Sequence, residues 1–241
     1  MTDQHLTPSA TRVLELLGQH RILRHLQPSE LQALVRGALV QKYLDRDPIF
    51  AQGDEGQSVV AVVEGFVKLS SSTSAGREVV LEIAGPGSVF GELAVINGWP
   101  RSADAQALST VRLLAIEGKS FMRALERAPA ALVELTKLLS ERLQRATEQI
   151  TDAVDMPAAA RLAKALTQLA GLHSHAGPDG LHIDLNLSQR ELGGMTGLTR
   201  ESINKHLATW RDSGWVKLSD GGIVLVNPRG LRDLFAVDVP A

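Results

Sequence analysis

One stretch of the chain combines a glycine, a carboxylate and a guanidinium in an order that can bind an anion. Residues 90–103 contain FGELA and PRSA, separated by five residues. Gly91 lets a ligand approach the backbone closely, the Glu92 carboxylate can accept a hydrogen bond from a ribose hydroxyl, and the Arg101 guanidinium can hold a phosphate. Backbone amides and Ser102 can add further donors. A lone arginine is usually a surface or structural residue, but this order between two strand signals favours a binding site.

A second group of residues predicts two short helices joined by a tight turn. Ser188 and Glu191 match the S-x-x-E capping box, in which both side chains satisfy free amides at a helix start. Gly197 then allows a sharp turn, and Thr199 can cap a second helix that runs through Trp210. Two short helices joined by a glycine-containing turn of this length form a helix-turn-helix.

The second of these helices has an apolar side and a polar side. In a helix that lies in the major groove of DNA, residues near its N-terminus meet base edges. Arg200 suits guanine O6 and N7, and Glu201 can accept from cytosine N4. A hairpin pattern over residues 214–226 follows and indicates a wing. The candidate DNA-binding residues are Ser188, Gln189, Arg200, Glu201, Ser202, Asn204 and Lys205. The alternative interpretation is a helical hairpin whose charged faces are merely solvated.

Net charge does not by itself indicate nucleic-acid binding. The formal charge is −2 for the 241 residues. Residues 158–241 hold 9 Lys and Arg against 8 Asp and Glu, a balance of only +1. Binding to DNA therefore has to be argued from the local arrangement of residues.

The spacing of apolar residues, which predicts the helices and strands that position these side chains, changes along the chain. Residues 11–43 have the spacing of short amphipathic helices, whereas residues 44–117 are short apolar runs cut by Gly and Asp. Such runs predict a sandwich or a barrel. Residues 118–153 return to helical spacing. Asp155-Met156-Pro157 then breaks the helix and is the best candidate for a hinge.

The helical segment carries a narrow apolar seam with charged flanks. The seam consists of Leu132, Thr136, Leu139, Leu143, Ala146, Ile150 and Ala153, in alternating steps of four and three. This spacing is typical of a coiled coil, so we favour a dimer interface. The alternative is a helix packed on its own barrel, for which Leu135 and Leu138 would serve.

Composition excludes several classes of site. The chain has no Cys, which removes disulfides, thiolate zinc sites, cysteine-ligated iron–sulfur clusters and cysteine nucleophiles. Residues 26–172 also lack His, so no usual haem or transition-metal ligand lies there. His173 and His175 fall in a stretch, residues 171–180, that we expect to be a solvated loop. We find no P-loop, nucleophile elbow or catalytic triad, and therefore expect no enzyme.

The N-terminus lacks the charged and apolar regions of a secretory signal, and no apolar run reaches the length of a membrane span. We therefore expect a cytoplasmic protein that does not contact a membrane.

Taken together, the motifs resemble the catabolite activator / fumarate–nitrate regulator (CRP/FNR) family of transcription regulators. The resemblance covers about residues 20–230 and rests on turns at Gly53, Gly65 and Gly87, on FGELA…PRSA and on LSQRELGGMTGLTRESINKHL. It implies an α+β fold. Residues 1–117 would form N-terminal helices and a jelly-roll-like cyclic-nucleotide-binding β-barrel, residues 118–154 a long dimerisation helix, and residues 155–241 a winged helix-turn-helix.

The resemblance also implies a nucleotide site. It would comprise Leu81, Glu82, Gly91, Glu92, Leu93, Arg101, Ser102, Arg142, Ala146 and Thr147. Glu92 would bind the ribose 2′-hydroxyl and Arg101 the cyclic phosphate together with Ser102. The base would face the dimer helix, near Arg142.

Two positions leave the identity of the base open. The best-known cAMP-binding members carry a Thr-Ser pair where this chain has Ala146 and Thr147, so one hydroxyl is lost. A strand position that is often Ser is Glu82 here. Its carboxylate can accept from adenine N6 but better suits the N1–H and N2–H donors of guanine. We expect cAMP as the effector, with cGMP as the alternative.

The implied function is a homodimeric regulator that binds double-stranded DNA at palindromic TGTGA-like sites under the control of a cyclic nucleotide. RNA polymerase is the further expected partner, and no metal, haem or iron–sulfur cluster is expected. One alternative is a nucleotide-binding module that acts on a protein partner, and another is a family member that responds to a different ligand. Arg200 and Glu201 favour DNA, because a protein-only module has no use for base-reading residues.

Overall fold

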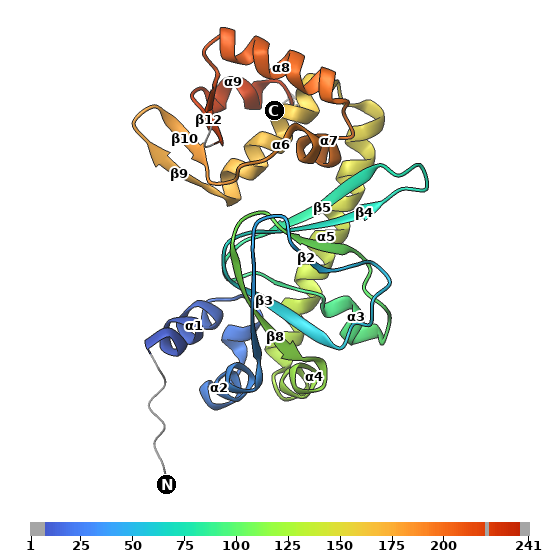
Figure 1. Ribbon diagram of the computed structural model, residues 1–241, viewed down its shortest axis with the longest axis vertical. Coiled ribbons are helices and arrows are strands. Elements are labelled where there is room, and N and C mark those ends of the chain that lie inside the picture. Colours follow the sequence, from blue (N-terminus) through green and yellow to red (C-terminus); the bar gives the residue numbers. More distant parts are fainter. Residues whose placement is uncertain (1–7, 220–221, 237–241) are drawn as a thin grey trace, which may run out of the picture. The chain divides into compact units, whose positions relative to one another are not determined.

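The computed structural model describes residues 8–219 and 222–236 (Figure 1). The chain divides into two compact units. The first comprises residues 1–71 and 81–143, and the second comprises residues 72–80 and 144–241. The long helix α5 begins in the first unit and ends in the second.

Eight short antiparallel strands form two four-stranded sheets, ordered β1-β8-β3-β6 and β2-β7-β4-β5. Their bounds are β1 Leu39–Tyr43, β2 Pro48–Phe50, β3 Ser58–Glu64, β4 Val67–Ser72, β5 Glu78–Ala84, β6 Val89–Phe90, β7 Asp104–Ala107 and β8 Val111–Glu117. Side chains of β3 contribute alternately to two hydrophobic cores, because successive side chains point to opposite faces of a strand. Val60 and Val62 join the apolar interior of the strand domain, whereas Val59, Ala61 and Val63 face the helices.

Helices cover the second of these faces. They are α1 Pro8–Gly18, α2 Pro28–Gly37, α4 Gly118–Arg127 and the start of α5, which spans Pro129–Asp155, with a 3₁₀ turn, η1, at Leu23–His25. Leu17, Leu23, Phe121 and Leu125 are buried in this layer. Figure 1 shows α1, α2 and α4 gathered at one end of the unit. A further short helix, α3 at Glu92–Asn97, follows β6 directly.

The second unit is a small α+β domain. It contains α6 Ala158–Leu172, β9 Ser174–Gly177, β10 Gly180–Ile183, α7 Gln189–Thr196, α8 Arg200–Asp212, β11 Val216–Ser219, β12 Gly222–Leu225 and α9 Pro228–Asp233. The strands form one sheet, ordered β11-β12-β10-β9. Buried Leu162, Leu166, Leu192, Ile203 and Leu225 form its core.

The predicted α+β architecture is confirmed, but three local predictions were wrong. Residues 39–43 form strand β1, which pairs with β8, and are not part of a helix. The segment 118–154 is two helices, because Pro129 cannot donate a backbone hydrogen bond and disfavours helical backbone at Ala128. The expected loop 171–180 contains the end of α6 and most of a hairpin of β9 and β10, and β10 pairs with both β9 and β12. His175 is paired within that hairpin, with Nδ1 2.5 Å from Asp184 Oδ1.

The predicted hairpin over residues 214–226 is formed by β11 and β12, and Asp220 and Gly221 between them lie outside the described residues. Within the part of the chain that the structure describes, no helix has the length and apolar character needed to cross a membrane.

Candidate functional site

The predicted anion-binding stretch folds as a strand, a glycine turn and a short helix. Strand β6 ends at Phe90, Gly91 adopts the left-handed backbone with φ of 81°, and α3 begins at Glu92. A Cβ atom on residue 91 would overlap the Arg101 guanidinium. Glycine is therefore required here both by its positive φ and by the close approach of Arg101.

Arg101 is held in a fixed orientation inside the first unit. Only 6% of the residue is exposed. Its Nη1 donates to the carbonyl oxygens of Ser58 at 2.8 Å and Gly91 at 3.1 Å, and its Nη2 donates to Ser58 Oγ at 3.1 Å. The guanidinium carbon lies 4.3 Å from the centre of the Phe50 ring, a favourable cation–π distance. The buried Nε makes no hydrogen bond to any described residue.

Glu92 is a buried carboxylate with one partnered oxygen. The residue is 2% exposed, and Oε1 accepts a hydrogen bond from Arg142 Nη1 on α5. Arg142 Nε also lies 3.0 Å from Glu82 Oε2 on β5, so one arginine bridges two carboxylates. Glu92 Oε2 has no hydrogen-bond partner among the described residues. Burial raises the pKa of Glu92 above its ordinary value, although the positive charge of Arg142 opposes this shift.

The structure brings together five of the ten predicted nucleotide-site residues, namely Glu82, Gly91, Glu92, Arg101 and Arg142. Leu93 directly follows Glu92 on α3 and is 36% exposed, and its role in the site stays a prediction.

The other predicted nucleotide-site residues are exposed. Leu81 is 49% exposed and, as the neighbour of Glu82 on a strand, points to the opposite face from it. Ser102 is an exposed loop residue. Ala146 and Thr147 are exposed positions of α5, four and five residues beyond Arg142, in the second compact unit. Their roles stay predictions.

Sequence reasoning missed Ser58 and Phe50, the two residues that fix Arg101. Ser58 opens β3 and Phe50 ends β2, some 40 to 50 residues before Arg101. No local motif marks either residue. Their positions follow from β3 and β2 lying near the loop that precedes β7.

The predicted helix-turn-helix is present with its expected caps. Ser188 Oγ accepts from the Glu191 amide at 3.3 Å, and Glu191 Oε2 accepts from the Ser188 amide at 2.6 Å, which completes the capping box. Gly197 ends α7 in the left-handed conformation with φ of 70°. Thr199 Oγ1 then accepts from the Ser202 amide at 3.2 Å and starts α8.

The polar side of α8 is exposed, as the sequence predicted. Glu201 and Lys205 are exposed, and Arg200 and Asn204 lie one turn apart on the same exposed face. Gln189 on α7 links these two, because its Oε1 accepts from Arg200 Nε at 2.9 Å and its Nε2 donates to Asn204 Oδ1. The arrangement presents amide and guanidinium groups side by side, as the reading of base edges and phosphates requires.

Comparison with known proteins gives the same two domains. A family model described as a cyclic nucleotide-binding domain matches residues 40–128, and one described as a Crp-like helix-turn-helix domain matches residues 160–234. The chain is 30% identical to the cyclic AMP receptor protein of Thermus thermophilus over 198 residues, which are 82% of this chain and 88% of that protein.

Further similarities extend over nearly the whole chain. It is 29% identical to the CRP-like cAMP-activated global transcriptional regulator of Mycobacterium tuberculosis, over 88% of this chain and 95% of that protein. The structure of FixK2 from Bradyrhizobium japonicum has the same fold, with a TM-score of 0.74 and 23% identity over 83% of this chain and 98% of that one. The curated relatives are transcription regulators rather than enzymes. The chain belongs to the CRP/FNR family of DNA-binding transcription regulators and carries a cyclic-nucleotide-binding domain.

Proposed function

We propose that the protein is a homodimeric regulator whose affinity for palindromic DNA is controlled by a cyclic nucleotide, with cAMP the favoured effector and cGMP the alternative. The names of the two curated relatives support cAMP. The observation that carries the proposal is a pair of buried polar atoms, Arg101 Nε and Glu92 Oε2, that have no hydrogen-bond partner in the described part of the chain.

These two atoms have opposite hydrogen-bonding character. Arg101 Nε–H is a charged donor, which suits a phosphate oxygen, and Glu92 Oε2 is an anionic acceptor, which suits a ribose hydroxyl. A buried polar atom without a partner costs free energy, and a ligand that supplies the partner recovers it. The negative charge of Glu92 acts on Arg101, so the two groups share one electrostatic environment. The residues therefore fit a cyclic nucleotide, whose phosphate and 2′-hydroxyl are rigidly joined.

The preference for one base rests on Glu82. Its carboxylate is an ion-pair partner of Arg142. A carboxylate that is already paired is a weaker acceptor for the two adjacent donors of guanine, and this favours adenine. Thr147 would then supply the remaining hydroxyl near the base.

Dimerisation would use the exposed apolar seam of α5. Leu143 is 70% exposed and Ile150 is 68% exposed, and Leu132 and Ala153 of the same seam are also exposed. Large exposed aliphatic residues in a coiled-coil spacing indicate a partner helix. A second copy of the chain supplies an identical seam, and the pairing would place two recognition helices about one turn of DNA apart.

On DNA, Arg200 would read a guanine and Glu201 a cytosine of the opposite strand, in half-sites like TGTGA and TCACA separated by about six base pairs. Nucleotide binding would favour one arrangement of the two C-terminal domains through the hinge at Asp155–Pro157, because a ligand shifts only the equilibrium whose states it binds differently. RNA polymerase would be the further partner during transcription.

Two experiments test the proposal. Calorimetric titration with cAMP and cGMP side by side should show tighter binding of cAMP, and absence of binding by both would reject a cyclic nucleotide as effector. Selection of DNA from a random pool should yield a palindromic consensus for the wild type. Arg200→Ala should lose one guanine position at a cost of roughly 1–3 kcal/mol. Arg211→Ala, an exposed arginine at the other end of α8, is the matched control. A consensus that is not palindromic, or that does not depend on Arg200, would reject the docking geometry.

A further inference from the structure

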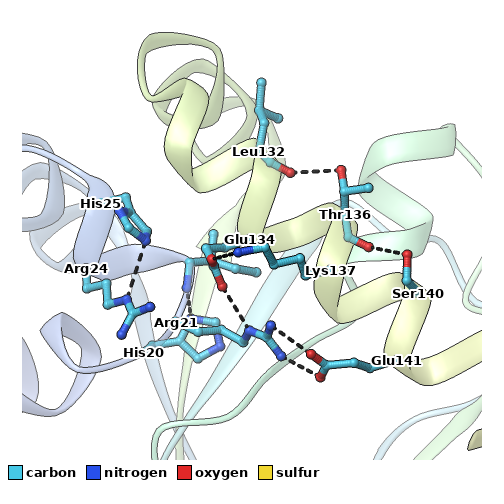
Figure 2. A network of polar contacts seen from close by, with 11 residues as sticks. His20, Arg21, Arg24, His25, Leu132, Glu134, Thr136, Lys137, Ser140 and Glu141 are labelled. Atoms are coloured by element: carbon cyan, nitrogen blue, oxygen red, sulfur yellow. Dashed lines mark hydrogen bonds and ion pairs between the residues drawn. The ribbon is translucent and has the colours of Figure 1, made fainter.

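Arg21, in the segment that follows α1, forms ion pairs with α5. Arg21 Nη1 donates to Glu141 Oε2 at 2.6 Å, and Nη2 donates to Glu141 Oε1 at 2.9 Å, which makes a bidentate pair. Its Nε donates to Glu134 Oε2 at 3.4 Å, and Lys137 Nζ donates to the other oxygen of Glu134 at 2.8 Å. Figure 2 shows these bonds converging on Arg21 from one side of α5. We call Arg21, Glu134 and Glu141 the clasp.

The clasp contacts α5 next to Arg142, the arginine of the proposed nucleotide site. Glu134 and Glu141 are seven residues apart, which is about two turns of an α-helix, so Arg21 spans two turns of the same face. Glu141 directly precedes Arg142 in the chain. Any shift or rotation of this part of α5 therefore moves the backbone that carries Arg142, whose Nη1 holds the Glu92 carboxylate.

His20 shows that the clasp and Arg142 share one environment. Burial, then the positive charge of Arg21, then that of Arg142 lower the pKa of His20 to about 4. Both charges therefore act on the same imidazole, which is neutral near pH 7. His20, Arg21, Glu82, Ser88 and Arg142 also line one pocket of about 370 Å³. Arg21 of the clasp and the pair of Arg142 with Glu82 thus line the same pocket.

We propose that Arg21 is a positioning residue for the nucleotide site, which acts through Glu141 and α5 to keep Arg142 on Glu92. The inference rests on the proposed binding of a cyclic nucleotide. Through this clasp the segment between α1 and α2 sets the nucleotide affinity of the sensor although it contributes no residue to the anion site.

If the clasp only stabilised the fold, its loss would lower the unfolding temperature. The side chains of Arg21 and Glu141 are 30% and 50% exposed, and ion pairs at such positions contribute little to the free energy of unfolding. Loss of the clasp should therefore leave the unfolding temperature nearly unchanged. It should nevertheless weaken nucleotide binding, because Glu92 then presents its free oxygen from a less fixed position.

The test is a double-mutant cycle on the full chain, with the affinity for cAMP measured by calorimetry and the fold checked by thermal unfolding. Arg21→Ala and Glu141→Gln should each weaken binding by a factor between roughly two and thirty, the range seen when coupling between residues is disturbed. The double variant should bind cAMP no more weakly than the weaker-binding single variant, because both substitutions remove the same ion pair. Arg24→Ala, an exposed arginine three residues further on whose Nε bonds His25, is the matched control and should bind like the wild type.

If the wild type binds cAMP and Arg21→Ala binds it equally well, the inference is overturned and the proposed function still stands. Full additivity of the two single effects would also overturn it, because the residues would then act independently. A wild type that binds neither cAMP nor cGMP would reject the proposed function, and the inference with it.

Discussion

Replacement of Arg101 by alanine is the perturbation whose effect follows most directly from the geometry of the site. In the structure Nη1 and Nη2 are occupied by Ser58 and Gly91, whereas the buried Nε–H has no partner among the described residues. A phosphate oxygen can therefore accept from Nε without displacing the bonds that orient the guanidinium.

The magnitude follows from the kind of bond that is lost. A hydrogen bond that involves a charged group contributes roughly 1.5–3 kcal/mol. Since about 1.4 kcal/mol corresponds to a tenfold change in affinity, Arg101→Ala should weaken nucleotide binding at least about tenfold. The same substitution leaves the carbonyl oxygens of Ser58 and Gly91 without this donor, which costs stability. A chain of this size should lose roughly 2–4 °C of unfolding temperature for each kcal/mol.

Calorimetric titration with cAMP, well below the unfolding temperature of the variant, measures the first effect, and a thermal scan measures the second. Arg123→Ala is the matched control, because Arg123 is an exposed residue of α4 whose Nη2 donates to the nearby Ser120 Oγ. It should match the wild type in both measurements. Affinity for cAMP that is unchanged in a folded Arg101→Ala variant would refute the assignment of the anion site.

Three further predictions concern other parts of the molecule. Because burial raises the pKa of Glu92, its carboxylate takes up a proton at a higher pH than an exposed glutamate does. Nucleotide affinity should therefore fall as the pH is lowered through the raised pKa. Glu92→Gln should flatten this dependence of affinity on pH in titrations between pH 5 and 8. Charged substitutions in the α5 seam, Leu143→Glu with Ile150→Glu, should give monomers by sedimentation, whereas the wild type should sediment as a dimer with or without nucleotide; a wild type that dimerises only with nucleotide contradicts this. Ser188→Ala should destabilise the C-terminal domain by about 1 kcal/mol through loss of the capping box, and an unchanged thermal scan would show that the cap contributes nothing.

Features set by neighbouring residues were predictable from the sequence. The capping box of Ser188 and Glu191, the left-handed Gly197 and the Thr199 cap all depend on contacts within a few residues, and all three are present. The helix break before Pro129 was also marked locally, since proline restricts the residue before it, but the long run of helical spacing concealed it.

Features set by distant pairing were not predictable. Strand β10 forms because Leu181 and His182 pair with Leu225 and Val224, more than 40 residues away, and a glycine-rich stretch gives little local sign of this. The setting of Arg101 is a similar case, because Ser58 and Phe50 reach it only through the packing of β3 and β2. The bridge from Arg142 to Glu82 and Glu92 likewise needs α5 to lie against the strands.

The most direct test of the account measures DNA binding with and without the effector. Fluorescence anisotropy with a palindromic TGTGA–TCACA duplex should be recorded at fixed salt for the protein alone, with cAMP and with cGMP, because affinity for DNA depends steeply on ionic strength. We expect cAMP to tighten binding of this duplex more than cGMP does, and neither nucleotide to change the binding of a scrambled duplex. Equal affinity for the palindrome with and without either nucleotide would contradict it.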